Sequence, residues 1–169
     1  MEYSDLLLAI APIGNDSFDK EPFNDYLKRV GYLLPNIPEC VFENWIYRHY
    51  SDIDDYSFLD FRKMQFEKVT WHKDKVYTEV NSYDDNHLIN SLGYQIYENS
   101  YLAWLQRYMI ENSTWPVPII VFENNTHSNM GKPYHLLEGH LRTNYFRTIY
   151  KQEKERLLEY HSVWKVTIK

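Results

Sequence analysis

The sequence predicts an α+β fold in which a helical N-terminal extension precedes a mixed sheet with flanking helices. In the first sixty residues, apolar side chains recur at spacings of three and four, which is typical of amphipathic helices. From Phe66 onward, short apolar runs of the strand type alternate with longer helical stretches. Aromatic residues make up 17% of the chain and supply ample material for a core. We therefore expect a helical extension over residues 1–65 and an α+β domain over residues 66–169.

The extension is expected to contain two helices. The first begins near Pro22 and ends at Val30, because Gly31 follows an apolar stripe of helical period. The second begins at Pro38, a residue suited to the first helical position, and carries its apolar side chains on one face. Residues 1–16 read as a short apolar segment ended by a turn, and residues 52–60 as an acidic loop or a further short helix.

The region after the extension is expected to start with two strands, over residues 67–71 and 76–80, joined by a turn at Lys73-Asp74. A helix capped by Asp85 or Asn86 follows as far as Ile96. A second helix, capped by Asn99 or Ser100, runs to Ile110.

The last third of the chain reads strand, loop, strand, turn, helix, strand. Pro116 and Pro118 stop the preceding helix, and an apolar strand covers residues 117–122. A polar loop over residues 123–132 leads to a second strand over residues 134–137, and Gly139 makes the turn. A helix is expected from His140 to about Leu158, and an alternating pattern predicts a final strand over residues 162–168.

The turn at residues 138–142, with the sequence Glu-Gly-His-Leu-Arg, is the candidate functional site. The first amides of a helix lack intrahelical acceptors, and the helix dipole adds partial positive charge there. Gly139 allows a sharp bend and close approach of a ligand. A cation in a first helical turn is unfavourable, so Arg142 is explained by a bound anion that its guanidinium grips. The alternative is that Arg142 pairs with Glu138 or lies along the surface.

Two neighbouring residues have a functional and a structural interpretation each. His140 can act as a general base or phosphate donor, or it can simply cap the helix or pack. Glu138 can hold a magnesium ion beside phosphates, or it can be a carboxylate stabilised by the helix dipole. The residues leave both pairs of alternatives open.

Motif and element order together resemble the ParB/sulfiredoxin-like superfamily. In that superfamily a proline-flanked strand leads through a loop to a second strand that ends in a Gly-x-x-Arg turn. This chain is similar over residues 66–169, and its Glu-Gly-His-x-Arg turn resembles the Asp-Gly-His-His-Arg type. The resemblance implies a nucleotide-binding domain with a mixed sheet.

Carried over by position, the resemblance implies that Gly139, His140 and Arg142 contact phosphates and that Glu138 matches the acidic residue of the motif. ATP or another nucleotide with Mg²⁺ would be the ligand, and Tyr134 could flank the base. Leu141 stands where the families have a second His or Arg, a residue that often touches the nucleotide. His140 stands where sulfiredoxins have their reactive cysteine, so sulfiredoxin chemistry is not expected.

Two function hypotheses follow. The first is a small nucleotide-binding protein, a phosphotransferase or NTPase in which Glu138 and His140 would be catalytic. The second is a non-catalytic protein-binding module of a bacterium or phage, such as an antitoxin, immunity or anti-defence protein. In that case the fold is a scaffold and the N-terminal helices contact the partner. Whether the chain is an enzyme stays open.

Charge and cysteine content narrow the class of protein. The net charge is −6, and residues 1–139 carry eleven Lys or Arg against twenty-one Asp or Glu, which argues against a general nucleic-acid binder. Residues 140–169 carry seven basic and three acidic residues, an excess that can receive one phosphorylated ligand or an acidic partner. The lone Cys40 fits a reducing cytoplasm, and the chain start resembles neither a secretory signal nor a membrane span. A cytoplasmic location is expected.

Overall fold

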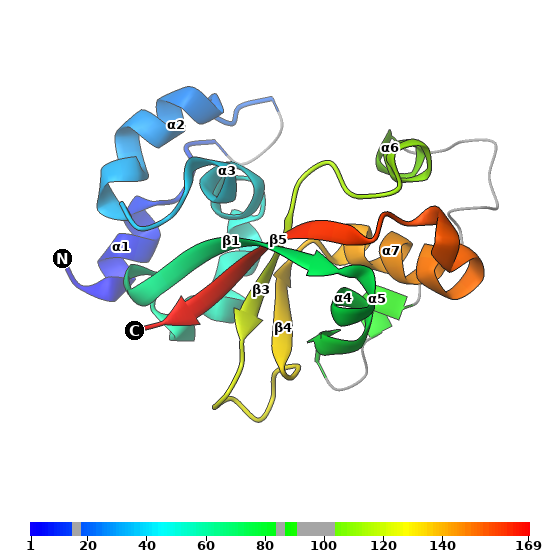
Figure 1. Ribbon diagram of the computed structural model, residues 1–169. Coiled ribbons are helices and arrows are strands. Elements are labelled where there is room, and N and C mark those ends of the chain that lie inside the picture. Colours follow the sequence, from blue (N-terminus) through cyan, green and yellow to red (C-terminus); the bar gives the residue numbers. More distant parts are fainter. Residues whose placement is uncertain (15–17, 84–86, 91–103) are drawn as a thin grey trace. The chain divides into compact units, whose positions relative to one another are not determined.

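The computed structural model describes residues 1–14, 18–83, 87–90 and 104–169 (Figure 1). The chain forms two units. Residues 1–66 together with Thr167–Lys169 make up unit 1, and residues 67–166 make up unit 2. The last three residues therefore belong with the N-terminal helices, although their sequence continues the final strand.

Unit 1 is built from short helices, as its sequence pattern predicts. The α-helices are α1 (Tyr3–Ala9), α2 (Phe23–Val30) and α3 (Glu39–Val41), followed by a π-helix η2 (Phe42–Tyr47). The 3₁₀ segments are η1 (Gly31–Leu33), η3 (Tyr50–Leu59) and η4 (Phe61–Lys63). The helix expected over residues 22–30 is confirmed.

Three local expectations for unit 1 need correction. Residues 3–9, expected to be an apolar segment, form a helix with Leu6 buried. Gly31 follows the last residue of α2 but does not stop helical structure. Its backbone is in the right-handed helical region, and it begins a 3₁₀ turn. Pro38 precedes the helix with an extended backbone instead of occupying its first position.

Hydrogen bonds from side chains to backbone hold the start of unit 1 together. The Tyr26 hydroxyl donates to the Ile10 carbonyl at 2.7 Å. The Arg29 guanidinium donates to the carbonyls of Ala9 (3.2 Å) and Ala11 (2.8 Å) and pairs with Glu21. These bonds connect the segment after α1 to α2. They also give hydrogen-bond donors to carbonyls at the C-terminal end of α1, where the helix itself supplies none.

Five strands form one mixed sheet in the order β1-β5-β3-β4-β2 among the described residues. Their bounds are β1 (Met64–His72), β2 (Val80–Asn81), β3 (Ile119–Glu123), β4 (Tyr134–Glu138) and β5 (Tyr160–Ile168). Strands β3 and β4 are antiparallel, whereas β3–β5 and β2–β4 are parallel. Figure 1 shows β3 and β4 side by side, joined by the loop that begins after β3. The α+β class predicted from the sequence is confirmed.

The second predicted strand is wrong. Residues 76–80 were expected to pair in the sheet, but α4 (Lys73–Glu79) covers most of them and β2 keeps Val80 and Asn81 alone. The Asp74 amide donates to Nδ1 of His72 at 3.2 Å, which caps the helix start. Val76 is buried in the core of unit 2. Capping and burial therefore outweigh the strand propensity of this run.

The remaining helices are α5 (His87–Asn90), α6 (Trp104–Asn112) and α7 (His140–Glu153), with a 3₁₀ turn η6 (Lys154–Arg156) after α7. The expected caps at Asp85 or Asn86 and at Asn99 or Ser100 lie outside the described residues, as do residues 91–96 of the predicted helix. Helix α7 begins at His140, as predicted, but ends five residues earlier than expected.

The core of unit 2 lies between the sheet and α7. Val121, Leu136 and Val163 contribute from three adjacent strands, and Phe146 and Ile149 contribute from α7. All of them are fully buried. This packing fixes the start of α7 against the end of β4, and so positions the candidate site.

In the described part of the chain, no helix has the length and apolar character needed to span a membrane.

Candidate functional site

The strand–turn–helix expected around Gly139 is present in unit 2. Strand β4 ends at Glu138, Gly139 adopts a left-handed conformation (φ 104°, ψ 31°), and α7 begins at the next residue. The amide of Thr143 donates to the Gly139 carbonyl at 2.8 Å, which closes the first helical turn. A left-handed backbone at this point strongly favours glycine.

Gly139 is also needed because there is no room for a side chain. A Cβ at this position would lie 2.7 Å from Cγ2 of Ile119 and 3.1 Å from Nη2 of Arg142. Ile119 begins β3, the neighbouring strand. The space beside the glycine is thus filled by the protein's own side chains.

Arg142 turns inward from the first turn of α7. Its Nη1 donates to the carbonyls of Val117 (2.7 Å) and Pro118 (3.3 Å), and its Nη2 pairs with the Glu138 carboxylate. The two charged side chains are only 9% and 12% exposed. We call this set of contacts, made by Arg142 with Glu138, Val117 and Pro118, the arginine clasp.

The arginine clasp contains the Arg142–Glu138 pair, which was predicted as the alternative to anion binding. It joins the end of β4, the start of α7 and the segment before β3. Residues 116–118 precede β3, and in the described part of the sheet no ladder partner donates to their carbonyls, so a guanidinium with several donors suits them. In this arrangement two nitrogens of Arg142 are committed to internal acceptors.

His140 is the first residue of α7 and is half-buried. It lies close enough to His135 to disfavour a positive charge on that ring. Burial, reinforced by His140, lowers the pKa of His135 to about 4. The Gly131 amide donates to His135 Nδ1 at 2.9 Å, so the neutral ring carries its proton on Nε2.

Tyr134 is not brought to the turn. It lies at the opposite end of β4 from Glu138, about 13 Å away at the usual rise per residue of a strand. Its ring packs against Trp71 with the ring centres 4.6 Å apart. Of the residues predicted to form the site, the structure gathers Glu138, Gly139 and Arg142 in mutual contact and places His140 next to them.

The loop before β4 is organised by a residue that the sequence pattern does not reveal. The buried Asn124 side chain donates to the carbonyls of His127 (2.8 Å), Met130 (3.1 Å) and Gly131 (3.1 Å), and accepts from the His127 amide (2.9 Å). A single asparagine in a run of polar residues gives no signal of this role. The polar loop expected over residues 123–132 is therefore closed on itself by Asn124.

A metal site is not assembled by the described residues. Among them, no group of three or more His, Cys, Asp or Glu side chains is placed to hold an ion. The Oε2 atom of Glu138, the carboxylate proposed for Mg²⁺, is paired with Arg142. The structure thus provides an argument for Glu138 as a structural carboxylate.

No family model matches the chain, and it matches no curated protein and no solved structure. The resemblance to the ParB/sulfiredoxin-like superfamily therefore stays a prediction that depends on the motif and on the order of elements.

Proposed function

We propose that this chain is a non-catalytic protein-binding module that presents unit 1 to its partner. The arginine clasp is the observation that carries the proposal. The two residues best suited to bind a phosphate and its metal, Arg142 and Glu138, are buried against each other. A residue pair used in this way supports the scaffold function of the strand–turn–helix.

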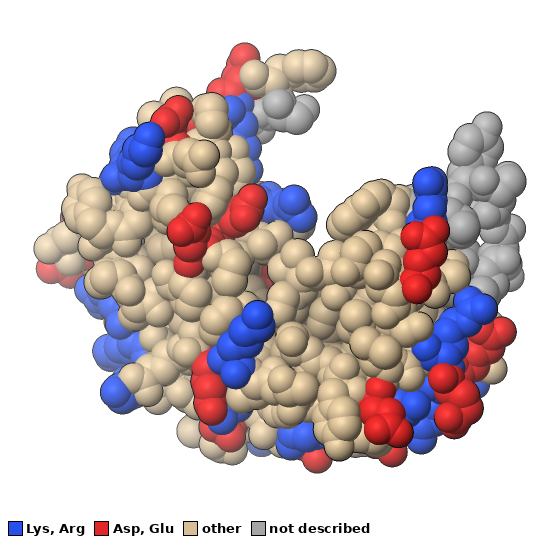
Figure 2. All heavy atoms as spheres, turned by 45° about the horizontal axis from the view of Figure 1, so that its top comes forward, with Lys and Arg blue, Asp and Glu red and all other residues tan. Residues whose placement is uncertain are grey.

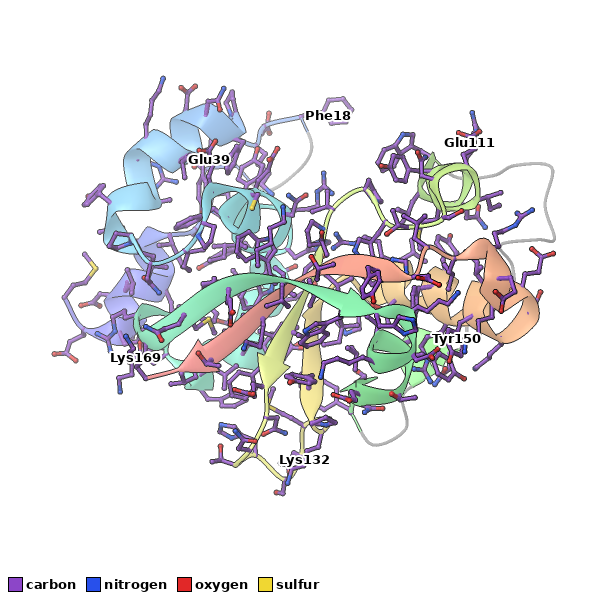
Figure 3. All side chains as sticks on the ribbon, viewed as in Figure 1. Phe18, Glu39, Glu111, Lys132, Tyr150 and Lys169 are labelled. Carbon is purple, nitrogen blue, oxygen red and sulfur yellow. The ribbon has the colours of Figure 1, made fainter. Side chains whose placement is uncertain are left out.

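The surface of unit 1 has the composition of a contact surface. Large apolar side chains are exposed at several places, among them Leu8 (73%), Phe18 (95%) and Tyr32 (74%). Figure 3 shows Phe18 projecting away from the helices of its unit. Exposed aromatic side chains are enriched at protein interfaces, where they provide much of the binding energy.

The charge of unit 1 indicates the kind of partner. Residues 1–66 contain twelve Asp or Glu and six Lys or Arg. Helix η3 contributes the exposed carboxylates of Asp52, Asp54 and Asp55. Such a surface suits a partner with basic residues around apolar contacts, since complementary charge speeds association and excludes wrong partners.

Affinity capture from the source cells tests this proposal. The wild-type chain is compared with the variant Phe18→Ser/Tyr32→Ser, which removes two exposed rings from unit 1. The matched control is Leu158→Ser, which removes an exposed apolar side chain from unit 2. We expect the unit 1 variant to lose about tenfold in affinity for the captured partner, and the control to retain it. Equal capture by all three proteins would contradict the proposal.

Nucleotide binding at the start of α7 is the second candidate function. It is favoured by the left-handed Gly139 followed at once by a helix of fourteen residues, the backbone arrangement that presents first-turn amides to an anion. Gly139 and His140 would supply amides, and Arg142 would exchange Glu138 for a phosphate. ATP or another nucleotide, with Mg²⁺ on Glu138, is the ligand that the family resemblance implies.

Thermal denaturation with ATP, ADP, CTP or GTP, with and without Mg²⁺, separates the two candidates. Saturating ligand at a hundred times its Kd would stabilise the folded state by about 2.7 kcal/mol. The binding-module proposal predicts no nucleotide-dependent rise in Tm. A rise that disappears in Arg142→Lys, which keeps the charge but loses the planar fork, would overturn that proposal and support the second.

A further inference from the structure

The ammonium group of Lys75 lies between two aromatic rings and a carboxylate in unit 2. Its Nζ is 4.8 Å from the ring centre of Trp71, 5.0 Å from that of Tyr134 and 2.7 Å from Oε2 of Glu79. The ring centres are 4.6 Å apart, and the ring planes meet at 50°. Both distances are within the range of cation–π contacts, so the ammonium contacts both rings. We call Trp71, Tyr134 and Glu79 the aromatic cage.

The aromatic walls of the cage are fixed by the sheet and the core. Trp71 stands on β1 and is 8% exposed within the core cluster of unit 2. Tyr134 stands on β4, where it pairs with Val80 of β2 and Glu123 of β3. Because strand pairing and core packing hold both rings, the cage is preformed and does not depend on its occupant.

The occupant is far less constrained than the walls. Lys75 belongs to the seven-residue helix α4, and its side chain is 34% exposed. Four methylene groups connect the ammonium to the backbone, so the group can leave the cage without any movement of the rings. Glu79 is 38% exposed, and the cage is therefore open to solvent on the carboxylate side.

We propose that the aromatic cage is a binding site for an alkylammonium head group and that Lys75 occupies it until such a ligand takes its place. The negative ring faces of Trp71 and Tyr134 attract a cation, and Glu79 neutralises its charge. A hydrogen bond from Lys75 to Glu79 raises the pKa of the lysine, against the effect of burial, so this position favours a positive charge. The site lies in unit 2 and does not depend on the proposed function.

Choline is a suitable probe, because it carries a quaternary ammonium that fits aromatic walls. Its neutral isostere 3,3-dimethylbutan-1-ol has the same shape without the charge. Binding is followed by isothermal titration of the full chain, with sodium chloride added to the isostere at equal ionic strength. We expect saturable choline binding to Lys75→Ala, about tenfold weaker binding to the wild type because Lys75 competes, and none of the isostere.

A second substitution in the Lys75→Ala background identifies the site. Adding Glu79→Gln removes the carboxylate of the cage and is expected to weaken choline binding about tenfold. Adding Glu111→Gln removes an exposed carboxylate on α6 and is expected to leave binding unchanged. Figure 3 labels Glu111 on α6, away from α4.

Two results would overturn the proposal. One is the absence of saturable choline binding to folded Lys75→Ala, with folding checked by circular dichroism. The other is equal binding of choline and the isostere, which would show that the cage does not recognise charge. Should Lys75→Ala fail to fold, Lys75→Gln is tested in its place with the same expected order of affinities.

Discussion

Arg142 shows how one residue can satisfy two different interpretations of the same motif. A guanidinium in the first turn of a helix meets unfavourable dipole charge and needs a negative partner. The structure supplies that partner as Glu138, together with the carbonyls of Val117 and Pro118. A negative partner is required at this position in both interpretations, and in the structure that partner is the Glu138 carboxylate.

Replacing Arg142 by alanine should strongly destabilise the fold. The change leaves the nearly buried Glu138 carboxylate without its cation and two carbonyls without a donor, which costs about 3–5 kcal/mol in the free energy of unfolding. Urea denaturation measures it. The control is Arg156→Ala, whose partner Glu153 is half-exposed, and it should cost less than about 1 kcal/mol. A loss of similar small size in Arg142→Ala would show that the clasp is not structural.

Gly139→Ala should also destabilise the fold. A left-handed backbone costs an L-residue about 1–2 kcal/mol, and the new Cβ would lie 2.7 Å from Ile119, which adds about 1 kcal/mol or more. Gly31→Ala is the matched control, since Gly31 has a right-handed helical backbone and its new Cβ would meet the flexible Leu27 side chain. Thermal denaturation of both variants should show a clearly lower Tm for Gly139→Ala alone.

At the scale of elements, α4 and α7 are joined by a stack of side chains. The rings of Tyr77 and Tyr150 lie parallel, with centres 3.9 Å apart. The Tyr150 hydroxyl donates to Asp74 at 2.7 Å, and Lys154 pairs with the same carboxylate. This contact explains why residues 73–79 are stable as a helix although their pattern suggests a strand. Tyr150, a residue of α7, is labelled in Figure 3.

A double-mutant cycle between Tyr77→Leu and Tyr150→Leu should reveal this contact. We expect the two rings to be coupled by about 0.5–1.5 kcal/mol, beyond the loss of area that each substitution causes. The comparison cycle pairs Tyr77→Leu with Tyr108→Leu on α6, whose ring contacts Trp104, and should be additive to within about 0.5 kcal/mol. Equal additivity in both cycles would refute a specific stack.

At the scale of the whole molecule, His135 and His161 are buried and uncharged. Figure 2 shows acidic and basic side chains interspersed on the face that it draws. Nε2 of His161 donates to the Leu158 carbonyl (2.9 Å), so in the neutral ring Nδ1 accepts from the Thr114 hydroxyl (2.7 Å). Burial is the main cause that lowers the pKa of His161 to about 4, as it does for His135.

These histidines make stability depend on pH in a defined window. The unfolded chain binds their protons below about pH 6.5, whereas the folded protein does so only near pH 4. The contribution of these two histidines to the free energy of unfolding is therefore fully present above about pH 6.5. It falls as the pH drops towards 4, by up to about 3 kcal/mol for each histidine.

Urea denaturation at pH 7.0 and pH 4.5 checks this dependence. His161→Gln, which keeps polar atoms but cannot be protonated, should show a clearly smaller loss of stability between the two pH values than the wild type. His49→Gln is the matched control, since it makes the same substitution at a substantially exposed histidine. An unaltered dependence in His161→Gln would contradict the assignment.

The sequence predicted much of the secondary structure. The prediction was wrong where a short run of residues was compatible with both a strand and a helix. Helix α2, strands β1 and β3 to β5, and the start of α7 follow from periodicity and from glycine and proline positions. The run at residues 76–80 has β-branched and aromatic residues, yet it became α4. The cap at His72 and the stack on Tyr150 come from tertiary neighbours that a local pattern does not contain.

By itself, the sequence determined the class of the fold, the acidic character of the first unit and the turn at Gly139, because these depend on composition and on local backbone preference. Tertiary structure alone decided what Arg142 binds. Its acceptors at Val117 and Pro118 lie 25 and 24 residues away along the chain, respectively, and only strand pairing brings them to the start of α7. The same holds for the cage around Lys75, where β1 and β4 bring two rings together from distant positions. A hydrogen-bonding side chain takes the partners that folding places within reach, and those partners are a property of the whole chain.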